Sequence, residues 1–489
     1  MKKLLVTSIF AVGMAVGAWA QDAAPTAVTQ ADLKALMDRI SRLEAENKAQ
    51  AEKIAHLEEV VAKSGARSET ETPAKEEGTE VSDSGRVYKT AQGYSYYLAD
   101  KFAGIFEPLT ASGLKLTPYG WLVMEATHNT RSTDVDAYTD WVRPKHASRR
   151  GHTTTFSVQD SILGFYVETP EESGGWKFKG KAEFDFTGGN ANDYVFHWRH
   201  LYMEGTHEES GWSILAGQTW HLWKMVSPSS IDGAWMEQTG YPYRRSPQFR
   251  ATKTFSFDDD SSLEFRAGLV KNGSGMGHDR DRDGNQDNSA SGWALVEGAA
   301  LYSQKASWTE DGSWMVGVGG MYGRDKSHRV NEDGGFGKAD EYDSKMVMVA
   351  GSVPLETAVG SFTLCGQLFA GDNLADVQGG VGQGVAFKSP DTRGREVSTI
   401  GGFVDLGYKV NDVWSFALGY GFDDPTDSEA RRAEGRCYND RVYIDAFYRV
   451  NANFRLGFEY AHLRTRYNLE DDPGTASDDR FQFTAFYDF

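Results

Sequence analysis

Basic side chains recur at alternate positions in one short stretch, "GWKFKGKAEFDF" (175–186). In a β-strand this spacing puts the lysines on one face with Glu183 and Asp185, and the aromatic residues on the other. Similar phasing places arginines of three later segments on the lysine face, and two more arginines fall in a connecting segment. A group of cations inside a low-dielectric wall attracts anions. The candidate anion-binding residues are Lys177, Lys179, Lys181, Arg199, Arg250, Arg266, Arg244 and Arg245.

Carboxylates on the same face could cancel this positive charge. Glu264, Asp445 and Glu459 are in phase with the basic residues. Pairing each cation with such a group would leave no preference for anions. The formal net charge of −19 does not decide between these alternatives, because the acidic residues crowd the segments between strands. It does argue against a nucleic-acid partner, whose phosphates would be repelled.

The stretch "DRDRDGNQD", 279–287, resembles the first half of a calcium-binding loop. Asp279, Asp281 and Asp283 precede Gly284, and carboxylate oxygens that converge before a sharp glycine turn suit Ca²⁺. Ala290 stands where an EF-hand needs a bidentate glutamate, and no flanking helices are expected. The alternatives are a structural Ca²⁺ site and a solvated acidic loop. No other cofactor is expected.

Nothing in the sequence indicates an enzyme. His197, His200 and His221 lie near tryptophans, without metal-ligand spacing to a carboxylate. No nucleophile elbow, phosphate-binding loop or paired catalytic carboxylates occur in the context that they need. Cys365 and Cys437 are too few for a disulfide scaffold, although a single bridge stays open as an alternative.

The elements that must position the basic residues are strands. From Leu114 to the C-terminus, apolar residues alternate with polar ones in sixteen segments. Most segments have the about 9–11 residues that a tilted strand needs to cross a bilayer, more than the five or six usual in soluble sheets. The predicted fold class is all-β: a sixteen-stranded antiparallel transmembrane barrel that spans 113–489.

The connections between these strands alternate between short and long. The short ones carry turn sequences such as "HEESG" and "VNAN", whereas the long ones include 129–152, 325–341 and 466–477. Outer-membrane barrels have short periplasmic turns and longer extracellular loops. An even number of strands puts both chain ends on the periplasmic side.

The C-terminus, "RFQFTAFYDF", keeps its apolar residues at every second position up to Phe489. In lipid every backbone polar group must be paired, so the last strand of a barrel must bond to the first. Only one face of each strand is apolar in such a wall, which agrees with the mean hydropathy of −0.52.

One long connection, 220–247, is unusually rich in apolar and aromatic residues: "WHLWKMVSPSSIDGAWMEQTGYPYRRSP". Loops exposed to water seldom carry so many. We therefore expect this loop to fold against the inner wall and to narrow the channel. An ordinary extracellular loop is the alternative.

The first 20 residues have two lysines, an apolar run and small residues before Gln21, which is typical of a cleaved secretory signal peptide.

Residues 30–62 show a heptad pattern of apolar positions, typical of a coiled coil. The stretch "RISRLE" within it resembles a known trimerisation pattern, with Asn47 setting the register; a dimer is the alternative. Residues 63–112 read as a polar linker and a segment leading into the barrel. The trimerisation residues are Arg39, Ile40, Leu43, Glu44 and Asn47.

The run "LAGQTWHLW", followed by Pro228, Asp232, Gly240 and "RRSPQFRAT", resembles the DcaP-like trimeric porins. That resemblance implies a coiled-coil-bearing, sixteen-stranded outer-membrane channel for small anionic solutes such as dicarboxylates. It covers coiled coil, linker and barrel in the same order. The phosphate-selective porins share the strand count and a related loop, and remain an alternative.

These observations together predict an outer-membrane porin barrel with an N-terminal trimeric α-helical coiled coil in the periplasm. The expected function is passive diffusion of small hydrophilic, anionic solutes through a water-filled channel. The expected partners are two further copies of the chain, outer-membrane lipid and the solutes. A structural protein that tethers the outer membrane to peptidoglycan through its coiled coil is the alternative function.

Overall fold

The computed structural model describes a large sheet of 18 strands together with the shorter elements between them. The described residues are 109–111, 114–144, 151–169, 173–188, 194–273, 293–309, 312–330, 335–430, 433–469 and 473–489. The signal peptide, the coiled coil with its trimerisation residues, and the linker up to 108 therefore lie outside the described residues. No helix within these ranges is both long and apolar enough to span a bilayer.

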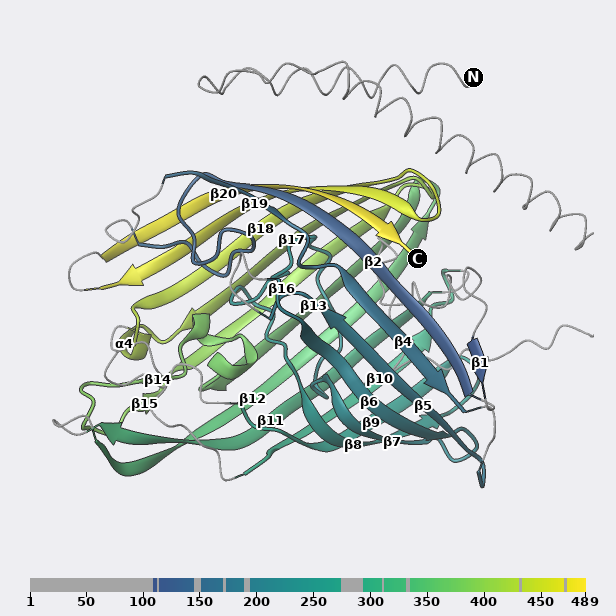
Figure 1. The fold of residues 1–489 in the computed structure, drawn as a ribbon, viewed down its shortest axis with the longest axis horizontal. Coiled ribbons are helices and arrows are strands. Elements are labelled where there is room, and N and C mark those ends of the chain that lie inside the picture. Colours follow the sequence, from purple (N-terminus) through teal and green to yellow (C-terminus); the bar gives the residue numbers. More distant parts are fainter. Residues whose placement is uncertain are drawn as a thin grey trace, which may run out of the picture. The chain divides into compact units, whose positions relative to one another are not determined.

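Antiparallel strands make up almost all of the described structure, as Figure 1 shows. The strands of the large sheet are β1 (Leu109–Ala111), β2 (Leu114–Asn129), β3 (Thr153–Ser157), β4 (Ile162–Glu168), β5 (Trp176–Asp185), β6 (His197–His207), β7 (Trp212–Trp220), β8 (Arg245–Ser256), β9 (Ser261–Val270), β10 (Leu295–Lys305), β11 (Ser313–Val330), β12 (Phe336–Thr357), β13 (Gly360–Asp372), β16 (Ser398–Lys409), β17 (Trp414–Pro425), β18 (Arg436–Arg449), β19 (Phe454–Asn468) and β20 (Pro473–Asp488).

The sheet closes into a barrel of sixteen wall strands. β3 and β4 pair with successive parts of β2 and form one wall strand, while β1 adds only three residues to the edge of β2. Closure comes from the pairing of β2 with β20, in which Trp121 lies opposite Asp488 and Asn129 opposite Arg480. The backbones of Gly120 and Phe489 then exchange two hydrogen bonds of 3.1 and 3.0 Å. The predicted sixteen-stranded barrel is confirmed, and its last residue is part of the seam.

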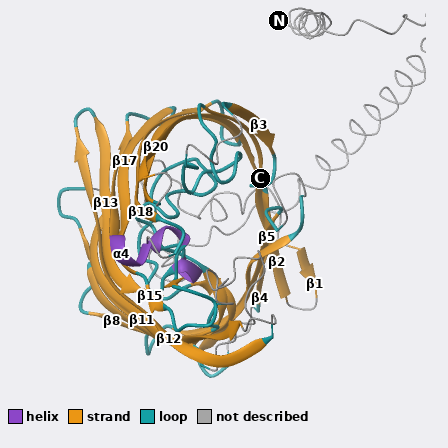
Figure 2. Ribbon diagram, turned by 90° about the vertical axis from the view of Figure 1, so that its left-hand side faces the viewer, coloured by secondary structure: helices purple, strands orange, loops and turns teal. Residues whose placement is uncertain are grey.

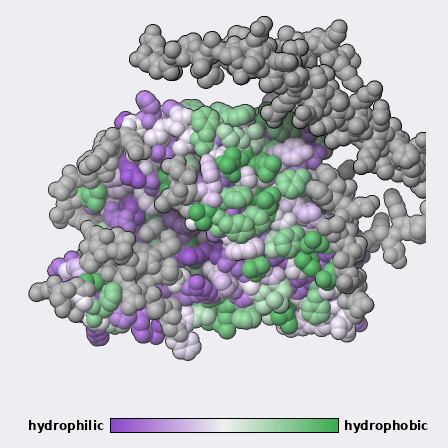
Figure 3. Space-filling model, in the orientation of Figure 1, coloured by the Kyte–Doolittle hydropathy of each residue, from purple (hydrophilic) through white to green (hydrophobic). Residues whose placement is uncertain are grey.

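Alternate side chains point outward along every strand, and most of these outward side chains are apolar. Hydrophobic side chains gather on the face seen in Figure 3. Aromatic residues lie toward the two ends of this apolar band: Trp308, Trp414 and Tyr448 near the short turns, and Tyr322 and Tyr460 toward the long loops. Such girdles mark the two membrane interfaces. Exposed aliphatic residues between them include Val318, Val349, Leu368, Leu418 and Ile444.

Two connections expected to be loops are largely strand. β11 and β12 continue through 325–330 and 336–341, and β19 and β20 take up much of 466–477. The expectation failed because these segments lose the apolar alternation. Their outward side chains are instead joined by ion pairs, such as Lys326 with Glu341 at 3.9 Å. A strand ladder can therefore continue beyond the apolar band without an apolar face.

The other long connections stay mainly irregular. The segment between β13 and β16 carries two 3₁₀ turns, η2 (Ala375–Val377) and η3 (Gly380–Gly382), and the small hairpin β14 (Val385–Ala386) and β15 (Arg395–Glu396). A short helix, α4 (Asp427–Ala430), follows β17. In Figure 2 the strands surround a space that these and other loops partly occupy.

A charge on the lipid face should destabilise this barrel according to its depth. Leu418→Arg places a cation in the middle of the apolar band and should lower the free energy of unfolding by about 2–4 kcal/mol. Ser398→Arg, on an outward position beside Asp372 near the loop end, should cost at most about 1 kcal/mol. Urea unfolding in lipid vesicles measures both. Equal costs at the two positions would contradict the assignment of the band.

Candidate functional site: a loop folded into the barrel

The segment between β7 and β8, residues 221–244, folds inside the barrel and packs against its inner wall. Its large apolar side chains are buried, among them Trp223, Met236 and Tyr241. The strands that bound it end at Trp220 and begin at Arg245, so the loop is slightly shorter than the 220–247 of the sequence prediction. We call residues 221–244 the inner loop.

The start of the inner loop is held by Glu297 of β10. One carboxylate oxygen accepts a hydrogen bond of 3.0 Å from the backbone N–H of Leu222, and the other accepts one of 3.2 Å from the indole N–H of Trp223. His221 Nδ1 lies 2.5 Å from the same carboxylate. Hydrogen bonds to a buried charge are each worth about 1.5–3 kcal/mol, so this end of the loop is fixed.

The middle of the inner loop is held by Asp232, whose carboxylate is buried between two arginines of the wall. Its Oδ2 lies 2.5 Å from Arg441 Nη1 on β18, and its Oδ1 lies 3.1 Å from Arg480 Nη2 on β20. Arg441 also pairs with Glu459 of β19. Opposite charges that share one buried site favour a single loop position, because any shift would leave a charge without its partner.

Two serines next to Asp232 make further contacts with the same wall. Ser229 Oγ donates to Asp405 Oδ1 over 2.8 Å, and Ser230 Oγ donates to Glu459 Oε2 over 2.7 Å. Carboxylates of β16 and β19, which could otherwise give the channel negative charge, are therefore used to bind the loop. Glu459 was one of the carboxylates expected to offset the basic residues of the strands, and it binds the inner loop.

Glycines of the wall allow the inner loop to lie close to the strands. A Cβ atom on Gly421 of β17 would overlap the carbonyl oxygen of Thr239, and one on Gly240 would overlap that of Gly402 in β16. Gly240 also has a φ of +111°, a conformation that other residues rarely adopt. The backbone of the loop thus rests directly on the backbone of β16 and β17.

Basic side chains gather where the inner loop leaves β7 and returns to β8. The indole of Trp220 carries two cations, with Lys224 Nζ at 4.7 Å and Arg245 Cζ at 4.5 Å from the ring centroid. Arg266 of β9 donates hydrogen bonds to the carbonyl oxygens of Leu222 and Lys224. We call Arg199, Lys224, Arg245 and Arg266 the basic cluster.

The surroundings of Lys224 lower the pKa of its ammonium group. Burial, together with Arg245, Arg266 and Arg199, lowers the pKa of the Lys224 ammonium to about 7. A like charge nearby disfavours the protonated form, and so does the loss of water. The side chain therefore titrates near neutral pH instead of near 10.

Several of the basic residues expected from the sequence have carboxylate partners on the same wall. Arg199 contacts Glu183 at 2.7 Å and Asp185 at 2.8 Å, and Arg266 contacts Glu264 at 2.6 Å. Lys181 lies 3.4 Å from Glu183, and Lys179 lies 3.3 Å from Glu204. Carboxylates on the strands therefore offset the charge of these four basic residues.

The remaining expected residues lie in different places. Arg244 Nη1 donates to the carbonyl oxygen of Asp376 in η2 over 2.6 Å, so it joins the inner loop to the loop after β13. Lys177 is half-exposed and pairs with Glu208 in the short turn after β6, away from the inner loop. Arg250 is buried in the wall on β8.

Acidic residues also gather at the inner loop, around Glu237. Glu237 lies near Asp140, which belongs to the loop after β2. Burial, with Asp232 and Asp134 nearby, raises the pKa of Glu237 to about 7. Burial and the Glu237 charge likewise raise the pKa of Asp140.

Four residues that hold the inner loop or form the basic cluster were not predicted from the sequence. Lys224, Asp232, Arg441 and Arg480 were not selected as site residues, although Asp232 lies in the quoted family motif. For Arg441 and Arg480 a signal existed, because each alternates with outward apolar neighbours along its strand. Lys224 carried no such signal, since its position depends on how the loop folds.

The cysteines and candidate metal ligands add no further site in the described ranges. Cys365 and Cys437 are both free and buried. No group of three or more potential ligands that could hold a metal ion is found among the residues that the structure describes. The proposed Ca²⁺ residues Asp279, Asp281 and Asp283 lie outside those residues, so this site stays a prediction.

The closed sixteen-stranded antiparallel barrel, with a long loop folded inside it, defines the fold of the outer-membrane porins. Among solved structures, the crystal structure of the outer membrane channel DcaP of Acinetobacter baumannii aligns with a TM-score of 0.61 at 16% identity, over 78% of this chain and 100% of that one. The resemblance to DcaP-like porins is thereby confirmed at the level of the fold.

Two other solved structures also align. OmpT, an outer membrane protein of Vibrio cholerae, has a TM-score of 0.48 at 13% identity, and Salmonella typhi OmpF has one of 0.46 at 16% identity. Each covers 78% of this chain and 100% of its own. No family model matches the sequence, and neither does any curated protein.

Removing the Asp232 carboxylate should release the inner loop. Asp232→Ala leaves Arg441 and Arg480 buried without it, at a cost of about 3–5 kcal/mol. We expect trypsin to cleave after Lys224 in the folded variant but not in the parent protein. Asp427→Ala removes an exposed carboxylate paired with Arg466 and serves as the control. Resistance of the Asp232 variant to cleavage would contradict this anchor.

Proposed function

We propose that this protein is an outer-membrane porin that lets small hydrophilic solutes diffuse passively through its lumen. The observation that carries the proposal is the inner loop, which is fixed to the inside of a closed barrel at both its start and its middle. A folded-in loop narrows a wide barrel to a size that selects solutes. A barrel used only as an anchor would not need such a device.

We further propose that the channel prefers anions. The supporting observation is the basic cluster at the base of the inner loop, where Lys224 and Arg245 share one tryptophan and the pKa of Lys224 is lowered by burial and by three arginines. So many cations in one low-dielectric region raise the local concentration of anions. The carboxylates that pair with Arg199 and Arg266 weaken this field.

The assembly also remains a proposal. The heptads of 30–62 favour a homotrimer held by a periplasmic coiled coil, with one pore in each protomer.

Ion selectivity tests the anion preference directly. In a planar bilayer with a salt gradient, the reversal potential of the native protein should show anion selectivity. Arg244→Ala/Arg245→Ala should lower the anion-to-cation permeability ratio several-fold, because it removes one cation from Trp220 and one from the loop beside it. The control is Arg464→Ala/Arg466→Ala, which removes two arginines from the outer face. Cation selectivity of the native protein would overturn the anion preference, and absence of open channels would overturn the porin function.

The anion preference should also fall as pH rises. Lys224 is charged below its pKa of about 7 and neutral above it, whereas Glu237, with a pKa of about 7, gains its negative charge over the same range. Both changes make the lumen less positive between about pH 6 and pH 8. The permeability ratio, measured across this range, should decrease in the native protein and less so in Lys224→Gln. An unchanged pH response in that variant would contradict the role given to Lys224.

A further inference from the structure

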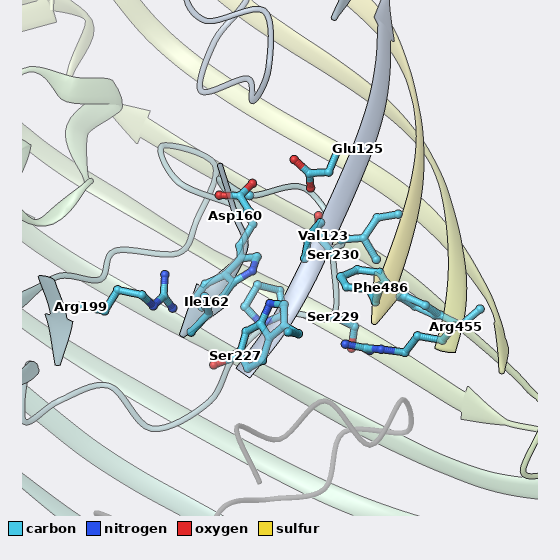
Figure 4. Close-up of a pocket in the computed structure, with 16 residues that line it drawn as sticks. Val123, Glu125, Asp160, Ile162, Arg199, Ser227, Ser229, Ser230, Arg455 and Phe486 are labelled. Carbon is cyan, nitrogen blue, oxygen red and sulfur yellow. The ribbon is translucent and has the colours of Figure 1, made fainter. Parts of the chain in front are cut away.

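A cavity of about 140 Å³ lies between the inner loop and the wall. Figure 4 shows its lining, to which the loop contributes residues between Ser227 and Trp235, and the wall contributes residues of β2, β4, β6, β18, β19 and β20. This volume is about ten times what one water molecule needs. Its apolar lining includes Trp121, Ile162, Trp235, Phe447 and Phe486. A cavity with such walls suits a solute with a flat apolar body.

Two acidic residues form one end of this cavity. Glu125 of β2 and Asp160, between β3 and β4, lie close together in Figure 4 and share a hydrogen bond. One of the two carboxyl groups must carry the proton that the other accepts, so the pair holds one negative charge. Glu125 also accepts a hydrogen bond of 3.0 Å from Gln482. We call Glu125 and Asp160 the acidic pair.

Two arginines line other sides of the same cavity. Arg199 and Arg455 appear on opposite sides of it in Figure 4. Arg199 belongs to the basic cluster, and its guanidinium is held by Glu183 and Asp185. Arg455 is held by Asp488 at 3.0 Å and lies over the ring of Phe486, 4.2 Å from its centroid. Both groups are therefore fixed in position before a solute arrives.

The charges of the cavity do not suit a solute with charge of one sign only. An anion without a cationic group would be drawn by the basic cluster but repelled by the acidic pair. An amine without an anionic group would be repelled by Arg199 and Arg455. A solute with both groups can place its anion toward an arginine and its ammonium on the acidic pair, where one charge meets one charge.

We propose that this cavity binds small zwitterions that have an apolar or aromatic body, as an amino acid of that kind does. The ammonium group lies against the acidic pair, the carboxylate lies toward Arg199 or Arg455, and the body lies among the tryptophans and phenylalanines. This proposal rests on the porin function proposed above. It assigns a substrate class to the acidic pair, which the anion preference alone leaves without a role.

Three solutes of similar shape separate the contributions of the two charges. L-phenylalanine carries both groups, 3-phenylpropionate carries only the carboxylate and 2-phenylethylamine only the ammonium. Each is added to single channels in a planar bilayer, and the interruptions of the ionic current are counted and timed. We expect L-phenylalanine to interrupt the current several-fold longer than either of the other two.

The variant Glu125→Gln/Asp160→Asn keeps the shape of the acidic pair and removes its charge. Its L-phenylalanine interruptions should shorten to those of 3-phenylpropionate, and its open-channel conductance should persist. Asp160→Asn alone, with a smaller shortening expected, provides the test if the double variant does not fold. The control Asp343→Asn/Asp479→Asn removes two outward carboxylates and should leave the interruptions unchanged.

The outcomes separate this proposal from the porin function. Open channels in which all three solutes act equally, or in which the acidic-pair variants keep the longer L-phenylalanine interruptions, would overturn the zwitterion site and leave the porin intact. A protein that inserts but shows no ionic current would instead overturn the porin function.

Discussion

The backbone of a chain in lipid has no water to bond with, and this constraint determines the rest of the structure. Every N–H and C=O in the wall must find a partner in a neighbouring strand, so the sheet has to close. Here the closure joins segments at the two ends of the barrel sequence, β2 and β20, and is completed by the hydrogen bonds between Gly120 and Phe489. The alternation of apolar and polar side chains follows, because one face of each strand meets lipid and the other meets the lumen.

Closure of a sixteen-stranded wall leaves a lumen that is wide enough to hold part of the chain itself. The inner loop occupies that space, and buried polar groups hold it there instead of a hydrophobic core alone. Asp232 between Arg441 and Arg480, and Glu297 under Leu222 and Trp223, fix where the backbone of the loop lies. The same contacts also determine which carboxylates of the lumen bind the loop. Asp405 and Glu459 of the wall accept hydrogen bonds from the loop, and Lys224 and Arg245 lie together on Trp220.

The sequence allowed the wall to be predicted almost completely, because lipid on one side and water on the other impose a period of two. The prediction failed at 325–341 and 466–477, where strands continue outside the apolar band and ion pairs such as Lys326 with Glu341 replace the apolar signal. The site was predicted less well. Arg199 and Arg266 were placed on the correct face, but which carboxylates they meet depends on the register of neighbouring strands. Lys224 and Arg244 could not be placed, since their positions follow from the folding of an irregular loop.

The glycines at the contact between the inner loop and the wall affect the diameter of the channel. A methyl group on Gly421 of the wall would meet the carbonyl oxygen of Thr239, and one on Gly240 of the loop would meet that of Gly402, so the distance of the loop from the wall is set by the absence of these methyl groups. Exchanging one hydrogen for a methyl at Gly421 would push the loop toward the barrel axis. The aperture could thus be adjusted over evolutionary time by residues that no solute ever meets, leaving the charges along its path unaltered.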